Sequence, residues 1–273
     1  MKVPKVGAVA AVTALVLSAA GCGLLPGDED KPMIQIGIKF DQPGLGLREP
    51  GDKFSGFDVD VARYVAKELG YAPDHIEFKQ VYSSDRELMI EQNEVDFIVA
   101  SYSINEKRKA KVDFAGPYFV AHQDLLVRST ESGINKAEDL NNKNLCSVTG
   151  STSAENVRTK LAPKAGITEV GGYSECVVAL KESVLDAMTT DNAILAGYAA
   201  QDINQGKFKL TGLKLSNEHY GIGLKKGNTD LQTKINAALR KMVQDGSWEK
   251  AVAANFGSVN FKNEPAPQIT EGR

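Results

Sequence analysis

The sequence predicts an α/β protein whose two similar halves face each other across a cleft. Short apolar runs of strand length alternate along the chain with amphipathic stretches of helix length, which is the pattern of a layered α/β fold. Two of the apolar runs, at 97–100 and 144–148, end in hydroxyl-bearing turns just before a helix. Open α/β sheets bind ligands at the carboxyl ends of their strands, so these turns predict two donor-rich lips of one cleft.

The first half of the chain opens this alternation. Ile34, Ile36 and Ile38 alternate with other residues, as in a half-buried strand. A helix follows in which Asp58 is a plausible cap, and its apolar residues recur at four-residue spacing up to Gly70. The remaining elements of this half are a strand, a helix and a strand, over residues 76–81, 86–92 and 97–100.

The pattern restarts after an apolar stretch at 119–127. The elements expected in the second half are strands at 144–148 and 167–170, helices at 154–161 and 177–188, and a helix or strand at 193–199. A long amphipathic helix over 228–243 and a last helix around Trp248 complete the fold. From Phe261 onward the chain has two prolines and no periodicity, which predicts a disordered tail.

Composition and charge exclude several classes of protein. The 273 residues are 42% hydrophobic and 25% charged, as is usual for a globular protein. The net charge is −3 and basic residues show no interleaving with aromatic ones, so we expect no nucleic-acid partner. No two of the three histidines have the spacing of metal ligands, so we expect neither a metal nor a cofactor.

The N-terminus has the pattern of a secretory signal peptide. Lys2 and Lys5 precede an uncharged apolar run at 6–20, which is shorter than the ~20 residues that a transmembrane helix needs. The small residues before Cys22 resemble the lipobox of bacterial lipoproteins, although Ala19 stands where leucine is usual. The resemblance implies a lipidated Cys22 as the mature N-terminus; the alternative is a plain secretory signal with an incidental cysteine.

Two cysteines remain, Cys146 and Cys176. An exported chain meets an oxidising compartment, so these two predict one disulfide. It would close a loop of about 30 residues and contribute roughly 3 kcal/mol to stability. The alternative is a pair of buried free thiols.

Residues 101–108 combine several groups that suit a carboxylate. Ser101 and Ser103 supply hydroxyls, and Asn105 can cap a short helix whose first turn holds Arg108. Helix N-terminal amides attract anions, and a guanidinium can bind a carboxylate through two parallel hydrogen bonds. The alternative is a strand, turn and helix with a surface arginine.

Five motifs of the chain belong together: GFDVDVAR (56–63), VDFIVASYSINEKRKAKVDFAGPYF (95–119), VTGST (148–152), DNAILAG (191–197) and DGSWEKAVAANFG (245–257). Together they resemble the substrate-binding proteins of polar amino-acid uptake transporters, solute-binding protein family 3. The resemblance covers residues 33–257 and implies the two-lobed periplasmic-binding-protein type II fold, with the cleft between the lobes and two hinge crossings. A further stretch, residues 38–46, resembles the glutamate-binding members of actinobacterial systems.

The resemblance implies a role for each of five residues at the common end of an amino acid. Arg108 would bind the α-carboxylate, and Ser101 and Ser103 would add hydroxyl or backbone contacts. Thr152 would donate to the same carboxylate from the second lobe, and Asp191 would accept the α-ammonium. Without the resemblance, Asp191 is interpreted only as a helix cap.

Three further residues are expected to recognise the ligand side chain. Lys39 lies near where relatives that bind neutral amides carry an acid, and Arg86 matches an arginine that binds the side-chain carboxylate in some acidic-amino-acid binders. Ser83 lies beside Arg86. The three cations and Asp191 leave two net positive charges, which suit L-glutamate better than a neutral amino acid. The alternative for Lys39 and Arg86 is solvated surface charge.

These observations predict a monomeric, lipid-anchored receptor on the outer face of the cell membrane. It would pass an amino acid to the permease subunits of an ABC transporter. The alternatives are a cyclohexadienyl-dehydratase-like enzyme on the same fold, although no histidine lies in the cleft motifs, and a sensor module for a signalling partner. The expected divisions are a signal peptide (1–21), a tether (22–32), lobe 1 (33–126 and 220–257), lobe 2 (127–219) and a disordered tail (258–273).

Overall fold

The computed structural model describes residues 1–2, 32–257 and 261–272. The expected signal peptide, Cys22 and nearly all of the tether lie outside these residues. The first described strand begins at Ile34. Within the described part of the chain, no helix has both the length and the apolar character needed to span a membrane.

One mixed sheet of nine strands runs through the described residues, in the order β5-β1-β6-β12-β7-β10-β8-β9, with β11 paired to β7. Its strands are β1 (Ile34–Ile38), β5 (Ile76–Gln80), β6 (Phe97–Ile98), β7 (Val112–Arg128), β8 (Asn144–Val148), β9 (Gly166–Val170), β10 (Ala187–Asp191), β11 (Phe208–Leu210) and β12 (Ser216–Lys225). A small second sheet joins β2 (Asp41–Gln42), β3 (Gly46–Glu49) and β4 (Lys53–Ser55).

Helices cover this sheet. The α-helices are α1 (Phe57–Glu68), α2 (Arg86–Glu91), α3 (Glu106–Lys109), α4 (Thr152–Asn156), α5 (Tyr173–Lys181), α6 (Asn192–Ala200), α7 (Thr229–Gln244) and α8 (Ser247–Phe256). A π-helical turn, Val157–Leu161, extends α4, and short 3-10 turns lie at Pro73–His75, Ala137–Leu140 and Asp202–Asn204.

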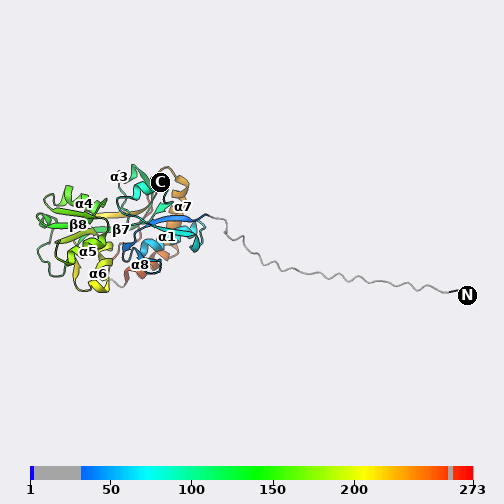
Figure 1. The fold of residues 1–273 in the computed structure, drawn as a ribbon. Helices are drawn as coiled ribbons and strands as arrows, with labels where there is room; N and C mark the ends of the chain where they lie inside the picture. The colour runs from blue at the N-terminus through cyan, green and yellow to red at the C-terminus, as the bar shows by residue number, and fades with distance from the viewer. Residues whose placement is uncertain (3–31, 258–260, 273) are drawn as a thin grey trace. The chain divides into compact units, whose positions relative to one another are not determined.

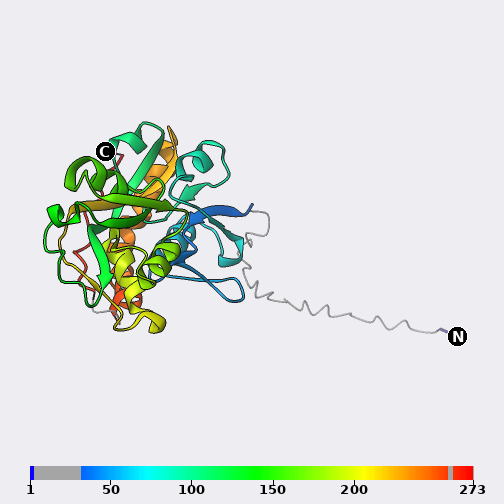
Figure 2. The same cartoon turned by 60° about the vertical axis from the view of Figure 1, so that its left-hand side comes forward.

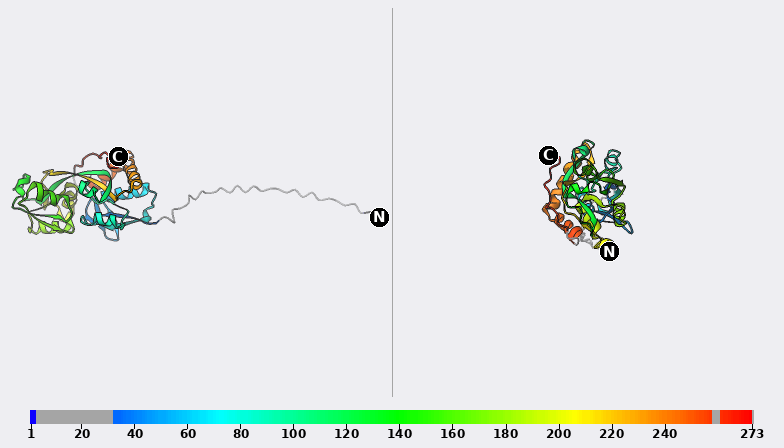
Figure 3. Two further views of the ribbon diagram at one scale, coloured as in Figure 1. Left: turned by 90° about the horizontal axis from the view of Figure 1, so that it is seen from above. Right: turned by 90° about the vertical axis from the view of Figure 1, so that its left-hand side faces the viewer.

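The long strands β7 and β12 divide the molecule into two lobes. They pair antiparallel along nearly their whole length, from Val112 opposite Lys225 to Gln123 opposite Ser216. Lobe 1 holds β1, β5, β6, α1, α2, α3, α7 and α8, and lobe 2 holds β8, β9, β10, α4, α5 and α6 (Figure 1). Seen from above, the two groups of elements stand apart and are joined by strands (Figure 3). The two-lobed type II fold expected from the sequence is therefore confirmed.

An aromatic cluster forms the core of lobe 1. The ring of Phe57, at the start of α1, lies 5.1 Å from that of Phe119 and 5.9 Å from those of Trp248 and Phe256. These contacts fix α1 and α8 to the sheet. Helices α7 and α8, orange to red in Figure 2, both pack on α1, so the end of the chain returns to the lobe in which it began.

The predicted disulfide is formed between Cys146 on β8 and Cys176 on α5, with 5.5 Å between the two Cα atoms. The amphipathic helix expected at 228–243 is confirmed as α7, and the side chain of Asn228 caps it by accepting a hydrogen bond from the Leu231 amide.

The prediction of a helix over residues 177–188 is wrong for the second half of that range. Helix α5 ends at Lys181, and Ala187 and Met188 belong to β10, where β7 and β8 flank them on both sides. Val178 and Val184, two apolar residues within the range of the expected helix, are 62% and 68% exposed. A strand that is paired and buried on both sides does not alternate apolar and polar residues, so its sequence resembles the apolar face of a helix.

The C-terminal segment also differs from the expectation of disorder. Residues 261–272 have defined positions: Ile269 is buried, and the amide of Thr270 donates to the Gly116 carbonyl at 2.8 Å. The ring of Phe261 lies 5.2 Å from that of Phe256. Isolated contacts anchor this segment without regular secondary structure, which is why it carries no periodic signal.

Candidate functional site

The sequence-predicted ligand residues line one small cavity between the lobes. Lobe 1 supplies six of them and lobe 2 supplies Thr152 and Asp191. The same wall includes Gln42, Ser151, Tyr173 and Ile194. The six from lobe 1 are Lys39, Ser83, Arg86, Ser101, Ser103 and Arg108.

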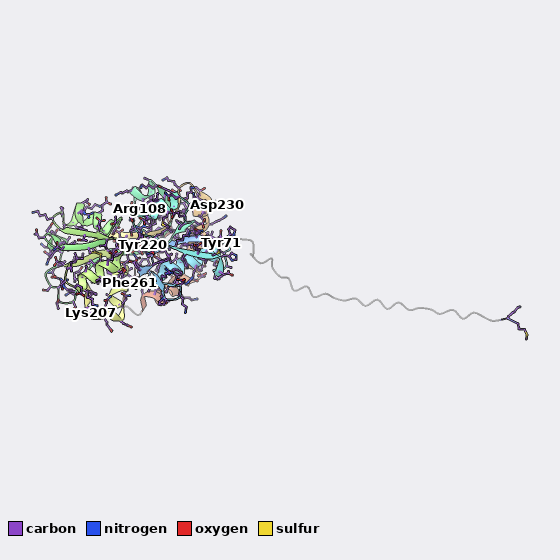
Figure 4. All side chains as sticks on the ribbon, in the orientation of Figure 1. Tyr71, Arg108, Lys207, Tyr220, Asp230 and Phe261 are labelled. Carbon is purple, nitrogen blue, oxygen red and sulfur yellow. A yellow bond between two sulfur atoms is a disulfide. The ribbon has the colours of Figure 1, made fainter. Side chains whose placement is uncertain are left out.

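Arg108, labelled in Figure 4, is one of the residues that line this cavity. The Asn105 side chain accepts a hydrogen bond from the Arg108 amide at 2.9 Å, so the predicted cap of α3 is confirmed. The guanidinium donates to the Ser103 carbonyl at 2.6 Å and, across the cleft, to the Gly150 carbonyl at 2.9 Å. Burial, with a smaller effect of the Arg86 charge, lowers the pKa of Arg108 to about 10, so it is a cation at neutral pH.

Lys39 and Arg86 are buried rather than solvated, with 4% and 2% of their surfaces exposed. The Lys39 ammonium donates to the Ser83 hydroxyl at 2.9 Å and has two further protons to donate. Burial and the neighbouring charge of Arg86 lower the pKa of Lys39. Both effects would be offset by an anion in the cavity.

The Arg86 guanidinium packs on Tyr102, 4.1 Å from the ring centroid. One terminal nitrogen donates to the carbonyls of Ala100 and Ser101, at 3.0 and 3.4 Å. Its Nε is buried and has no partner among the described residues. Arg86 therefore supports the end of the strand at Ala100 and still holds an unused donor beside the cavity.

Ser101 is held in the left-handed region of the backbone, with φ of 47°. Its amide donates to the Asp58 carboxylate at 2.9 Å, and its hydroxyl donates to the Gln42 side chain at 2.8 Å. The Tyr118 hydroxyl donates to the other Asp58 oxygen at 2.7 Å. The expected cap role of Asp58 is therefore wrong: Gly56 is the N-cap of α1, and Asp58 supports the turn at Ser101.

Burial raises the pKa of Asp58 to about 6, and its hydrogen bonds oppose this rise. The motif GFDVDVAR contained the residue, but its contact partner lies 43 residues further on. That distance is why the sequence alone did not place Asp58 at the site.

Asp191 ends β10 and precedes α6, yet its side chain makes no capping hydrogen bond. One carboxylate oxygen accepts from the Tyr220 hydroxyl at 2.6 Å. The other, Oδ1, is buried and has no partner among the described residues. Burial, followed by the charge of Glu218, raises the pKa of Asp191 to about 8. A buried carboxylate oxygen at a cavity wall is costly without a partner, so this atom suits a cationic group of a ligand.

The Thr152 hydroxyl already has a partner in this structure. It donates to the Glu218 carboxylate at 3.2 Å, and Ser216 donates to the other oxygen of Glu218 at 2.6 Å. Glu218 lies on β12 and was missed in the sequence, which offers no local signal for it. Any direct bond from the Thr152 hydroxyl to a ligand requires the contact with Glu218 to break.

Three acidic residues stand behind the cavity wall and do not line it: Asp58, Glu87 and Glu218. Glu87 lies 3.6 Å from Nε of Arg108. Counting all of these groups, acidic residues outnumber the three cations, whereas the lining itself keeps three cations and one carboxylate. The net positive charge expected from the sequence therefore holds for the inner wall and not for the surroundings.

This arrangement offers cations from one lobe and, from the other, an aspartate with one unpartnered oxygen, which matches a zwitterion. Among the described residues, no group of histidine, cysteine, aspartate and glutamate side chains is placed to hold a metal ion.

The chain belongs to the bacterial extracellular solute-binding proteins, family 3, whose model matches residues 34–258. It is 44% identical to the glutamate-binding protein GluB of Corynebacterium efficiens, over 88% of this chain and 84% of that protein. It is 41% identical to the ABC transporter glutamine-binding protein GlnH of Bacillus subtilis, over 81% of this chain and 80% of that protein. A solved structure of an ancestral arginine-binding protein bound to glutamine is similar at a TM-score of 0.77 and 34% identity, covering 83% of this chain and 99% of that one.

Proposed function

We propose that this protein is the extracytoplasmic receptor of an ABC uptake transporter and that its ligand is L-glutamate. The observation that carries the proposal is the unpartnered, buried Oδ1 of Asp191, a residue that lines the same small cavity as Arg108. An α-amino acid carries an ammonium and a carboxylate on one carbon, so it pairs with both groups at once. The names of relatives at about 40% identity, glutamate-binding and glutamine-binding, support this class of ligand.

In the proposed complex, Arg108 binds the α-carboxylate with help from Ser101, Ser103 and Thr152. Its bond to the Gly150 carbonyl is replaced by stronger charge-assisted bonds. Asp191 accepts the α-ammonium. These contacts involve only atoms that every α-amino acid carries, so they set affinity without selecting a side chain.

Selection of glutamate falls to Lys39, Ser83 and Arg86. Lys39 has protons to spare, and Arg86 has an unpartnered Nε. A carboxylate accepts from both, whereas the amide of glutamine would bring its NH₂ group toward one of two cations. Desolvated like charges and donors facing donors are costly, so the wall favours the acid.

We propose that lobe 1 comprises residues 33–126 and 220–257, that lobe 2 comprises 127–219, and that the crossings lie in β7 and β12. Rotation about these strands would close the lobes over the ligand and exclude water, which strengthens its ion pairs. The closed monomer would then dock on the permease subunits while a lipid on Cys22 holds it at the membrane. Mass spectrometry of the membrane fraction should find Cys22 acylated.

Titration calorimetry with glutamate, glutamine, aspartate, asparagine and arginine tests the proposal. We expect glutamate to bind most tightly, with glutamine at least about tenfold weaker, a difference of roughly 1.4 kcal/mol. Tighter binding of glutamine would assign the protein to the amide ligand. Absence of binding to all five would refute the amino-acid receptor itself.

A further inference from the structure

We infer that Gly150 and Gly197 are positioning residues for the ligand. At these two points the backbone of lobe 2 touches that of lobe 1 so closely that any side chain would hold the lobes apart. The inference rests on the proposed function, because it concerns how Thr152 and Asp191 reach a ligand held by lobe 1.

Gly150 lies in the turn between β8 and α4, two residues before Thr152. A Cβ atom there would lie 2.8 Å from both the carbonyl oxygen of Ser83 and the amide nitrogen of Ser84. Both are backbone atoms, so they cannot rotate away as the end of a side chain could. The Gly150 carbonyl also accepts the hydrogen bond from Arg108 across the cleft, at 2.9 Å.

Gly197 lies within α6, the helix that follows Asp191. A Cβ atom at this position would come within 1.9 Å of the Pro43 carbonyl oxygen and 2.9 Å of its carbon. Alanine is the better helix former, so local structure gives no reason for glycine here. Close approach to the loop of lobe 1 gives one.

Hydrogen bonds beside Gly197 hold the same contact. The Tyr198 hydroxyl donates to the backbone carbonyl of Asp41. The amide of Ser174, at the start of α5, donates to the Asp41 carboxylate at 3.5 Å. The segment of lobe 1 from Asp41 to Pro43 therefore packs against two helices of lobe 2. It includes Gln42, which lies in the cavity wall.

The two contacts bracket the site. Gly150 meets Ser83 and brings Thr152 toward Arg108, while Gly197 meets Pro43 and brings Asp191 toward Lys39. A methyl group at either position would push lobe 2 outward and stretch the contacts that a ligand makes with both lobes. Wedging atoms into such a close contact costs about 1–3 kcal/mol.

Gly150→Ala and Gly197→Ala test this by calorimetry and by stopped-flow kinetics. With L-glutamate as the probe, or L-glutamine if the wild type prefers it, we expect Kd to rise at least about tenfold, mainly through faster dissociation. Wild-type affinity in both variants would overturn the inference.

Matched controls separate closure from folding. Gly212, with φ of 77°, has the same backbone conformation as Gly150, with φ of 81°, but nothing lies within 4 Å of its Cβ position. Gly212→Ala should therefore leave Kd unchanged while it carries the same backbone strain. Gly197→Ala should keep or raise the melting temperature, because alanine favours the helix, while it weakens binding.

A second readout needs no ligand, so failure of the proposed function leaves the inference testable. Lys107 and Glu155 face each other across the cleft, with Nζ and Oε2 3.4 Å apart. In a full chain carrying Cys22→Ser, Lys107→Cys and Glu155→Cys, a short bismaleimide traps each transient closure. We expect Gly150→Ala and Gly197→Ala to slow this crosslinking at least about fivefold relative to Gly212→Ala. Equal rates would contradict the inference even if the wild type bound no amino acid.

Discussion

The two lobes present their polar groups to the cavity in different states of pairing. In lobe 1, Arg108 and Lys39 each have an acceptor from their own lobe, the Ser103 carbonyl and the Ser83 hydroxyl. In lobe 2, Oδ1 of Asp191 has no partner among the described residues. Arg108 and Lys39 of lobe 1 are thus held before a ligand arrives, although Nε of Arg86 is not, whereas Oδ1 of Asp191 in lobe 2 still needs a donor. From the proposed function we expect a ligand to bind lobe 1 first and its ammonium then to favour closure.

Removing the central cation of lobe 1 should give the largest effect. Arg108→Ala is expected to weaken every amino acid by at least about a hundredfold, because loss of one member of a buried charged pair costs about 3–5 kcal/mol. Arg108→Lys keeps the charge but loses the paired hydrogen bonds, so its affinity should lie between those of the wild type and Arg108→Ala. Unchanged calorimetric affinity in Arg108→Ala would show that the carboxylate binds elsewhere.

The carboxylate of lobe 2 should make binding depend on pH. Burial raises the pKa of Asp191 to about 8, and only its ionised form pairs with an ammonium. Affinity is therefore expected to fall about fiftyfold from pH 8 to pH 6, with proton release on binding. Calorimetry in buffers of different ionisation enthalpy measures both quantities.

Stability of the ligand-free protein should change in the opposite direction. The folded state holds a proton on Asp191 between about pH 4 and pH 8, where the unfolded chain has lost it. This contribution to stability is therefore lost as the pH rises through that window. Asp191→Asn should bind weakly at pH 8 and lose most of the pH dependence; a remaining step near pH 6 would belong to Asp58, whose pKa is raised to about 6.

A change at the selective wall of lobe 1 should alter preference more than total affinity. Lys39→Met removes the charge at similar length. We expect the ratio of glutamate to glutamine affinity to fall about tenfold, since a buried charge-assisted bond is worth roughly 1.5–3 kcal/mol. Equal losses for both ligands in the calorimetric panel would place the ligand side chain away from Lys39.

The smallest effect is expected at the hydroxyl of lobe 2. Thr152→Val should weaken glutamate by less than about fivefold, because a bond from the hydroxyl to the ligand would only replace the one that it already donates to the Glu218 carboxylate. Glu218→Gln, which can still accept from Thr152, is the matched control. A loss in Thr152→Val as large as that in Arg108→Ala would show that lobe 2 is prepared as fully as lobe 1.

The residues that the sequence singles out line one cavity, whereas the residues that support them were not anticipated. Residues such as Ser101, Arg108 and Asp191 follow strand ends inside contiguous motifs, so their neighbourhood could be inferred before the fold was known. Asp58 and Glu218 reach the site from elements 43 and 66 residues away from their partners, and no local pattern reports such a contact. The net positive charge expected for the site likewise left out acidic residues that stand behind the cavity wall.

The fold shows the same division between local and distant information. Helix α7 carries a complete amphipathic pattern and a cap, and both were predicted. Strand β10 has another strand on each side, and its residues do not show the alternation of apolar and polar side chains by which a strand is recognised in a sequence. The C-terminal segment is held by isolated contacts and has no periodic pattern, so the sequence predicted disorder there.

That segment has a practical consequence for anyone who expresses the protein. Trimming the chain after α8, as its sequence alone would suggest, would remove the buried Ile269 and expose the groove that it fills. It would also break the bonds that Thr270 and Glu271 make to the Gly116 carbonyl. A purification tag is therefore better placed beyond Arg273 on a flexible spacer, or at the other end of the chain, than in place of these last residues.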